Sequence, residues 1–130
     1  MTEKTPAEKL RLKSGMSAAL LHVPDGLATV LGVPEGVDVR VEPAGADFIL
    51  DFATTQAQAE ERLTELRPSM GDNTVTWMGY PKGSKAAGHD ISRDTIWKFA
   101  RTIGLVLNAN VAIDEKWSAV RMRPIRPGEE

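Results

Sequence analysis

Apolar residues in this chain occur in short runs, and the pattern within each run distinguishes strands from helices. Six runs are predicted to be strands: 17–23, 37–42, 48–52, 74–80, 105–113 and 117–124. Several of them are nearly continuous in apolar or β-branched residues, which is typical of strands covered on both faces of a sheet. The 37–42 run instead alternates valine with charged residues, as expected of an edge strand with one wet face.

Helices are expected between these strands, where apolar residues recur every three or four positions behind a capping residue. Thr5, followed by Pro6 and by Glu8 at the capping-box spacing, begins the first helix. A brief second helix is predicted over 27–31, before Gly32. The two longer helices begin at caps and bury one stripe each: Thr55 with Ala59, Leu63 and Leu66, and Ser92 with Ile96, Phe99, Ala100 and Ile103.

The order of these elements predicts one α/β domain. Strands alternate with helices along most of the chain, which favours three layers, with helices on both faces of a mostly parallel sheet. The last two strands form an antiparallel hairpin, so the sheet is mixed and has about six strands. A chain of 130 residues suits a single domain, 1–130, whose ends at 1–5 and 126–130 are expected to fray.

Several segments resemble the class I methyltransferase fold, which is Rossmann-like. The lead-in 10–16, the strand 48–52 with its helix, and the elements from Trp77 onward are similar to parts of that family. The resemblance implies the sheet order 37–42, 17–23, 48–52, 74–80, 117–124 and 105–113, with 117–124 antiparallel. One departure is clear, because the five-residue link after 37–42 leaves no room for the family's extra strand and helix. That link is also short for a parallel crossover, which normally needs about a dozen residues.

A second resemblance covers nearly the whole chain. Its motifs are similar to those of the bacterial domain-of-unknown-function 3052 family: Ala7-Glu8-Lys9-Leu10, Lys13-Ser14-Gly15-Met16, Trp77 with Pro81-Lys82, Asp90-Ile91, Gly104-Leu105 and Trp117-Ser118-Ala119-Val120-Arg121. The family name carries no activity, so this resemblance implies a single-domain fold and no particular reaction.

Composition excludes several classes of function. The chain has no cysteine, which excludes disulfides, thiolate metal sites and a cysteine nucleophile. Its two histidines are too few for a typical catalytic zinc site, so no metal is predicted. The net charge of -2 gives no whole-chain argument for a nucleic-acid partner. No apolar run approaches the ~20 residues of a membrane span and no targeting segment is visible, so we expect a cytoplasmic protein with no membrane partner.

Positive charge is concentrated late in the chain. Residues 81–126 hold nine Lys or Arg and four Asp or Glu, whereas the other residues hold seven and fourteen. The loop after the 74–80 strand lies in this region, at the carboxyl end of a central parallel strand, where open α/β sheets bind ligands. It predicts a cradle for a phosphate or carboxylate, although the P-loop order is absent and a solvated basic loop is the alternative. The predicted ligand-binding residues are Lys82, Gly83, Ser84, Lys85, His89, Asp90 and Arg93.

Neither histidine is predicted to be catalytic. His89 and Asp90 lie beside Arg93, but residues adjacent in sequence often point apart, and no nucleophile stands nearby. His22 ends an apolar strand and is expected to be a buried histidine with one hydrogen bond. The three tryptophans are expected to pack in the core.

The turn after the first strand lacks the sequence that a nucleotide cofactor needs. S-adenosylmethionine sites of the methyltransferase fold use a glycine-rich turn there and an acid at the end of the second strand. In this chain residues 22–26 read His-Val-Pro-Asp-Gly, with one glycine and one proline, and Glu42 is the candidate acid. We therefore predict the fold without its cofactor.

Together these patterns predict a non-catalytic module that binds a small anionic ligand or a protein partner at the 80–93 loop, in a regulatory role. The alternative is a transferase of the S-adenosylmethionine-dependent methyltransferase type, with an atypical pocket beside 23–26 and Glu42. A purely structural subunit is the third interpretation, and the sequence specifies no oligomeric state.

Overall fold

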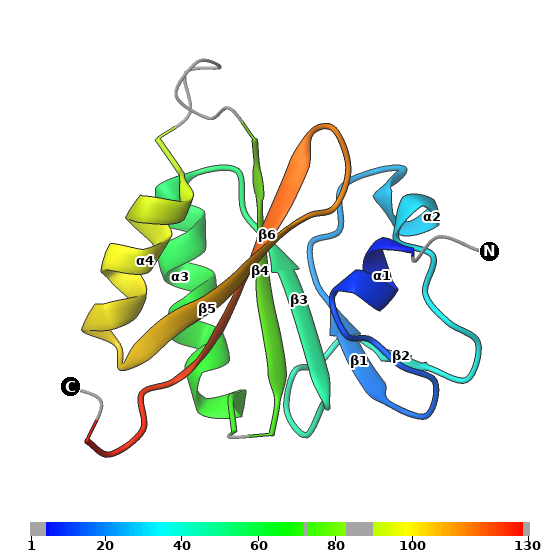
Figure 1. The fold of residues 1–130 in the computed structure, drawn as a ribbon, viewed down its shortest axis with the longest axis horizontal. Helices are drawn as coiled ribbons and strands as arrows, with labels where there is room; N and C mark the ends of the chain where they lie inside the picture. The colour runs from blue at the N-terminus through cyan, green and yellow to red at the C-terminus, as the bar shows by residue number, and fades with distance from the viewer. Residues whose placement is uncertain (1–4, 72, 83–89, 129–130) are drawn as a thin grey trace.

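The computed structural model describes residues 5–71, 73–82 and 90–128, and a six-stranded sheet runs through its centre (Figure 1). The strands are β1 (Ser17–Leu20), β2 (Asp38–Arg40), β3 (Phe48–Phe52), β4 (Val75–Pro81), β5 (Leu105–Ala112) and β6 (Trp117–Pro124). Their order in space is β2-β1-β3-β4-β6-β5, with the first four parallel and β6 antiparallel to both neighbours. The predicted order is confirmed, including the edge position of 37–42. Residues 1–4 and 129–130, part of the ends expected to fray, lie outside the described residues.

Helices cover both faces of the sheet and complete three layers. The helices are α1 (Pro6–Lys9) and α2 (Leu27–Leu31) on one face, and α3 (Gln56–Leu66), the 3-10 helix η1 (Arg67–Ser69) and α4 (Arg93–Thr102) on the other. Alternation along β3 separates the two cores, because Ile49 packs with α3 and α4 while Phe48 and Leu50 pack with α1 and α2. The predicted fold class is therefore confirmed. No helix within the described ranges is long and apolar enough to cross a membrane.

Side-chain caps begin the helices where the sequence predicts them. At α1 the Thr5 hydroxyl accepts a hydrogen bond from Glu8 N, and the Glu8 carboxylate accepts one from Thr5 N. α4 also begins at its predicted cap. At α3 only half of the capping box forms: Thr55 accepts from Gln58 N, but the Gln58 side chain accepts from Thr54 instead. The hydrogen bonds from Thr54 to Gln58 connect the start of the helix to the segment that leaves β3.

Two strands are shorter than predicted. β1 ends at Leu20 because His22 adopts a φ of 53°, in the left-handed region, which takes the chain out of the extended conformation. β2 has only three residues, all of them exposed. Val39 is 55% exposed and Val41 82% exposed, so the alternating valines do not form the expected buried face. The pattern indicated the edge position correctly and the burial of these two valines wrongly.

The short link from β2 to β3 is a parallel crossover that the strand register makes possible. Val39 and Phe48 are both level with Ala18 of β1. The chain leaving Arg40 therefore steps back by about one residue, roughly 3 Å, while it crosses two strand spacings of roughly 5 Å each. Residues 41–47 form the link and contain no helix, and an extended chain of this length spans more than the distance between Arg40 and Phe48. The extra strand and helix of the larger fold are absent from this link, as predicted.

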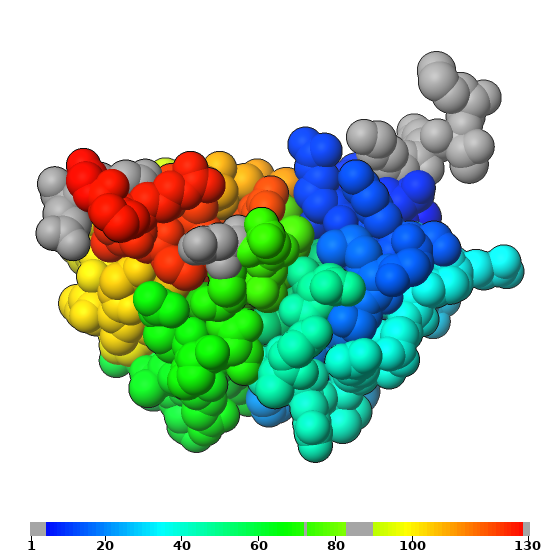
Figure 2. Space-filling model, turned by 90° about the horizontal axis from the view of Figure 1, so that it is seen from below, coloured from blue at the N-terminus to red at the C-terminus, as the bar shows by residue number. Residues whose placement is uncertain are grey.

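Figure 2 shows how the chain is distributed from one end of the molecule to the other. The early segments, in blue and cyan, lie at one end, and α4 with the C-terminal segment, in yellow and red, lies at the opposite end. α3 and β4, in green, lie between them. The two edge strands of the sheet, β2 and β5, are therefore far apart.

Candidate functional site

The connections of the sheet change direction between β1 and β3. From β1 the chain passes to β2 on one side, and from β3 it passes to β4 on the other. Open α/β sheets bind ligands in the crevice at the carboxyl ends of such diverging strands. His22 follows β1 and Asp51 lies near the end of β3, so both residues belong to this switch point.

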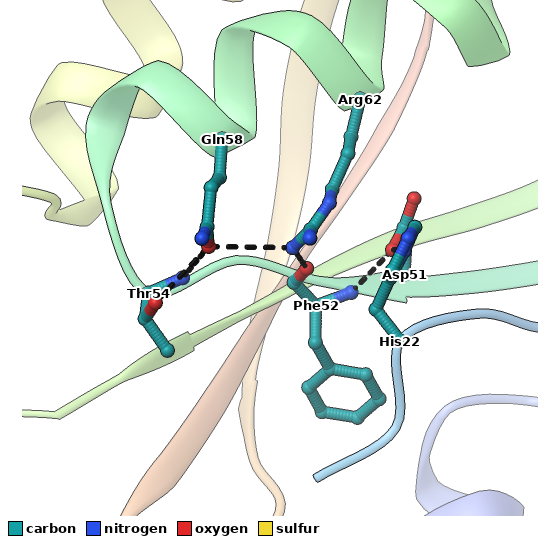
Figure 3. A network of polar contacts seen from close by, with 6 residues as sticks. All are labelled: His22, Asp51, Phe52, Thr54, Gln58 and Arg62. Atoms are coloured by element: carbon teal, nitrogen blue, oxygen red, sulfur yellow. Dashed lines mark hydrogen bonds and ion pairs between the residues drawn. The ribbon is translucent and has the colours of Figure 1, made fainter.

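His22 and Asp51 form a hydrogen-bonded pair at the switch point (Figure 3). The distance from His22 Nδ1 to Asp51 Oδ1 is 2.7 Å, and the same oxygen accepts from Phe52 N at 2.8 Å. The Asp51 side chain is 2% exposed, whereas that of His22 is 51% exposed. Burial raises the pKa of the Asp51 carboxyl above its ordinary value, and the hydrogen bonds from His22 and Phe52 and the charges of His22 and Arg62 oppose that rise. The pair thus joins a buried carboxyl to an imidazole that solvent or a ligand can reach.

Polar side chains of α3 extend the network toward the same edge. Arg62 donates to the Phe52 carbonyl and, at 3.4 Å, to Gln58 Oε1. Gln58 Oε1 also accepts from the backbone N–H and hydroxyl of Thr54, at 2.9 and 3.0 Å. Figure 3 shows both side chains pointing from the helix toward the end of β3, beside the His22 and Asp51 pair. The guanidinium is therefore held in place, because two acceptors anchor its Nη1 group.

A pocket of about 270 Å³, here called the aromatic pocket, opens next to this network. Phe52 and Trp117 contribute to its floor; Phe52 is 1% exposed, and its ring meets the Trp117 ring edge to face with centroids 5.5 Å apart. The polar side chains that line it are His22, Thr54, Gln58 and Arg62. Ligand pockets commonly measure roughly 300–1,000 Å³, so the aromatic pocket suits a small ligand or one part of a larger one.

A second pocket of about 190 Å³, here called the aliphatic pocket, lies on the other side of the same side chains. It is lined by Leu21, His22, Val41, Pro43, Asp51, Arg62, Glu65 and Leu66. His22 and Arg62 border both pockets, so they stand between two neighbouring hollows. This arrangement suits a ligand with two distinct parts, one aromatic and one polar.

Of the residues predicted from the 80–93 loop, the structure describes Lys82, Asp90 and Arg93, and none of these lines either pocket. Lys82 is exposed, and its backbone N–H donates to the carbonyl of Lys116. Asp90 accepts from Gln56 N at 2.8 Å, so it caps α3 rather than starting its own helix. Arg93 is exposed and lies 3.9 Å from an Asp94 oxygen. No hydrogen bond joins these three residues to one another in the part of the chain that the structure describes. Gly83, Ser84, Lys85 and His89 lie outside the described residues.

The prediction for His22 was half right. It makes the one expected hydrogen bond, but it is exposed rather than buried, because its left-handed backbone turns the chain out of the sheet. The signal that could have found the site is its place directly after the first strand, with an aspartate near the end of the 48–52 strand. Adjacent parallel strands bring such residues together at their carboxyl ends. Within the described ranges no group of three His, Cys, Asp or Glu side chains could hold a metal ion.

Comparisons with known proteins identify the fold. No family model matches the chain, so the resemblance to the domain-of-unknown-function 3052 family stays a prediction, and no curated protein matches it either. Among solved structures, a methyltransferase from Aquifex aeolicus that depends on S-adenosylmethionine is similar, with a TM-score of 0.61, 15% identity and coverage of 90% of this chain and 88% of that one. The mitomycin 7-O-methyltransferase MmcR has a TM-score of 0.65 at 11% identity, over 92% of this chain and 53% of its own.

The neocarzinostatin O-methyltransferase NcsB1, solved with S-adenosylmethionine and a naphthoic acid, is also similar, with a TM-score of 0.61 and 17% identity. The match covers 89% of this chain but 50% of that enzyme, so the chain spans about half the length of NcsB1. A protein of the NADB-Rossmann superfamily from Streptococcus agalactiae matches over 97% of this chain and 70% of its own, with a TM-score of 0.53 and 10% identity. These likenesses define a Rossmann-like, methyltransferase-like α/β fold, and at such identities they define the fold alone.

Proposed function

We propose that this protein binds S-adenosylmethionine or a related adenosyl ligand at the switch point and is a small transferase of the methyltransferase type. The observation that carries the proposal is the pair of pockets on either side of His22 and Arg62, at the edge where open α/β sheets bind ligands. S-adenosylmethionine consists of a nucleoside and an amino acid, and two adjoining pockets suit a ligand of two parts. The fold neighbours that depend on this compound support the choice of ligand class.

The residues present fit such a ligand through side chains rather than through the backbone. The partly buried Trp117 ring, which rests against the Phe52 ring, offers an apolar surface for a flat base, and the Gln58 amide and Arg62 guanidinium supply hydrogen-bonding groups beside it. The turn after β1 offers no close-fitting backbone for a ligand, because a Cβ added at Gly26 would have no heavy atom of another part of the chain within 4 Å. The sequence-based prediction of a fold without a cofactor rested on that turn, and the proposal departs from it because α3, β3 and β6 build the pocket instead.

The side chains at the switch point have distinct tasks in this proposal. S-adenosylmethionine, when bound, supplies an electrophilic methyl group. Ionised Asp51 accepts a hydrogen bond from His22 Nδ1, which orients the imidazole and leaves Nε2 for a hydrogen bond to a ligand. Arg62, anchored on the Phe52 carbonyl, has further N–H groups for a carboxylate. A buried carboxyl with a raised pKa beside an exposed imidazole is typical of functional sites.

Calorimetric titration of S-adenosylmethionine, S-adenosylhomocysteine, adenosine and methionine into the protein tests the proposal. We expect binding of both adenosyl amino acids, and roughly tenfold weaker binding in His22→Ala and in Arg62→Gln, the effect of about one charge-assisted hydrogen bond. Arg67→Gln is the matched control, because Arg67 also donates to a backbone carbonyl, that of Ile103 at 2.9 Å, but lines neither pocket. An absence of heat from every ligand would exclude the proposal, and binding that neither variant weakens would exclude the site.

A non-catalytic module that binds a small anion at the 80–93 loop is the competing proposal. Lys82 and Arg93, on either side of residues 83–89, are both exposed and positively charged, which supports it. Titration of phosphate and of nucleotides into the protein and into Lys82→Ala distinguishes the two. Anion binding that Lys82→Ala abolishes and Arg62→Gln leaves intact would favour the module over the transferase.

A further inference from the structure

A groove of about 500 Å³ lies between α4 and the edge strand β5. Figure 1 shows where these two elements lie, at the edge of the sheet away from β2. Arg93, Asp94 and Trp97 line it from the helix, and residues 107–110 line it from the strand. None of these residues borders the two pockets at the switch point. The groove is therefore a separate feature of the surface.

The strand that forms one wall of the groove is an edge strand with little protection. β5 is the last strand of the sheet and pairs with β6 on one side only. Its eight residues include no charged residue and no proline, the devices that usually prevent pairing with another chain. One irregularity in register, between Leu107 and Ala109, is the only protection among the paired residues of this strand. The backbone of β5 is thus available to an additional strand.

The helix that forms the other wall carries an exposed aromatic ring and positive charge. Trp97 was expected in the core, but it is 46% exposed because it stands one position beyond Ile96 on the buried stripe. The Arg101 guanidinium lies 5.9 Å from the centre of its ring. Arg93 and Lys98 are also exposed on α4, with Asp94 as the one acid there. The wall therefore has an apolar contact surface within a positively charged surround.

We propose that this groove binds an extended acidic segment of a partner protein, which adds a strand to the edge of β5 and places carboxylates against the cations of α4. Charge complementarity favours this occupant over a second copy of the chain, because two copies joined at β5 would bring two positively charged α4 faces together. Backbone pairing favours a peptide over a nucleic acid, which has no backbone N–H and C=O groups to pair with a strand.

The test is a titration of the isotope-labelled protein with an eight-residue acetylated peptide in which glutamate alternates with valine, followed by NMR. We expect the Trp97 indole N–H and the amides of β5 to shift, while the indole of the buried Trp77 does not. Arg93→Glu and Arg101→Glu are each expected to weaken binding by roughly fivefold, as for an exposed charge pair. Lys9→Glu, an exposed cation on α1, is the matched control, and Gln variants at 93 and 101 replace the Glu variants if these reduce folding.

Four further measurements decide between the occupants. A peptide with lysine in place of glutamate, and an acidic peptide N-methylated at alternate residues so that it cannot pair, are both expected not to bind. Equal binding of either control peptide would overturn the proposal, as would an acidic peptide that shifts no resonance of β5 or Trp97. If light scattering shows a dimer whose β5 amides are protected without peptide, the groove binds a second copy of the chain. If oligouridylate shifts the Trp97 resonance at a lower concentration than the peptide does, the groove binds a nucleic acid.

Discussion

Replacing Gly79 by alanine tests whether the floor of the aromatic pocket is packed as tightly as the structure indicates. Gly79 lies in β4 and pairs with Phe52 of β3. A Cβ on this residue would stand 2.5 Å from Phe52 Cδ2 and 2.6 Å from Cε2. Carbon atoms pack at roughly 3.5–4.0 Å, so the ring must move by about 1 Å. The buried ring already rests against Trp117, so it can move only by displacing that contact or by entering the pocket.

The magnitude follows from two opposing terms. Overpacking a core of this kind lowers the free energy of unfolding by about 1–3 kcal/mol. The alanine raises it by about 0.4–1 kcal/mol, because it reduces the conformational freedom of the unfolded chain. The difference between the midpoints of these two ranges is a net destabilisation of roughly 1.3 kcal/mol. With an unfolding entropy of about 2.1 cal/mol/K per residue, a chain of 130 residues loses about 5 °C in melting temperature.

Thermal and urea unfolding of Gly79→Ala, Gly71→Ala and the wild type provide the assay. Gly71 is the matched control, because its added Cβ would meet only Thr74 Oγ1, at an ordinary 3.5 Å, and should change stability by less than about 0.5 kcal/mol. Phe52→Leu in the Gly79→Ala background should recover part of the loss, with a coupling energy of at least about 0.5 kcal/mol. A Gly79→Ala protein as stable as Gly71→Ala would show that the ring moves without cost, and the reasoning about the pocket floor would be wrong.

Substitutions at three other positions test the network, the core and a helix cap. The raised pKa of Asp51 means that the folded state holds this proton more tightly than the unfolded state, so the free energy of unfolding should fall as pH rises from the ordinary aspartate pKa through the raised one. Urea titrations should accordingly show Asp51→Asn gaining stability over the wild type between pH 4 and pH 7; an equal difference at both pH values would contradict the burial argument. Trp77→Phe loses the buried hydrogen bond from Nε1 to the Leu10 carbonyl, 2.8 Å long, and should cost about 1–3 kcal/mol in chemical denaturation. Ser92→Ala removes the cap of α4 and should cost about 1 kcal/mol, whereas Ser92→Asn should be nearly neutral in the same assay.

The strands and helices could be predicted from the sequence because their signals are local, whereas the order of the strands came from the resemblance to the methyltransferase fold. The apolar run at 48–52 is entirely buried in the structure, and Thr5 and Ser92 cap their helices as their spacing indicates. The exposure of Trp97 also followed from the sequence, because the buried stripe of α4 passes through Ile96 and the next position lies outside that stripe. These features depend on a few consecutive residues, and neighbouring elements only reinforce them.

The candidate site could not be predicted in the same way, because it depends on contacts between distant residues. His22 and Asp51 are 29 positions apart, and neither belongs to a motif. The sequence analysis favoured the 80–93 loop because its polar residues are consecutive and therefore visible. The switch point instead follows from the direction of two connections, β1 to β2 and β3 to β4. The strand order that the methyltransferase resemblance implied already contained it, but no continuous run of polar residues marks it.

The short link between β2 and β3 contributes to the site at that edge. β1 and β3 are adjacent and their connections diverge, so the crevice is present without an extra strand and helix between β2 and β3. The link begins at the carboxyl end of β2, where Val41 and Pro43 form part of the wall of the aliphatic pocket, and it ends at the amino end of β3. The aliphatic pocket is small, so the ligand that we propose would extend across His22 and Arg62 into the aromatic pocket.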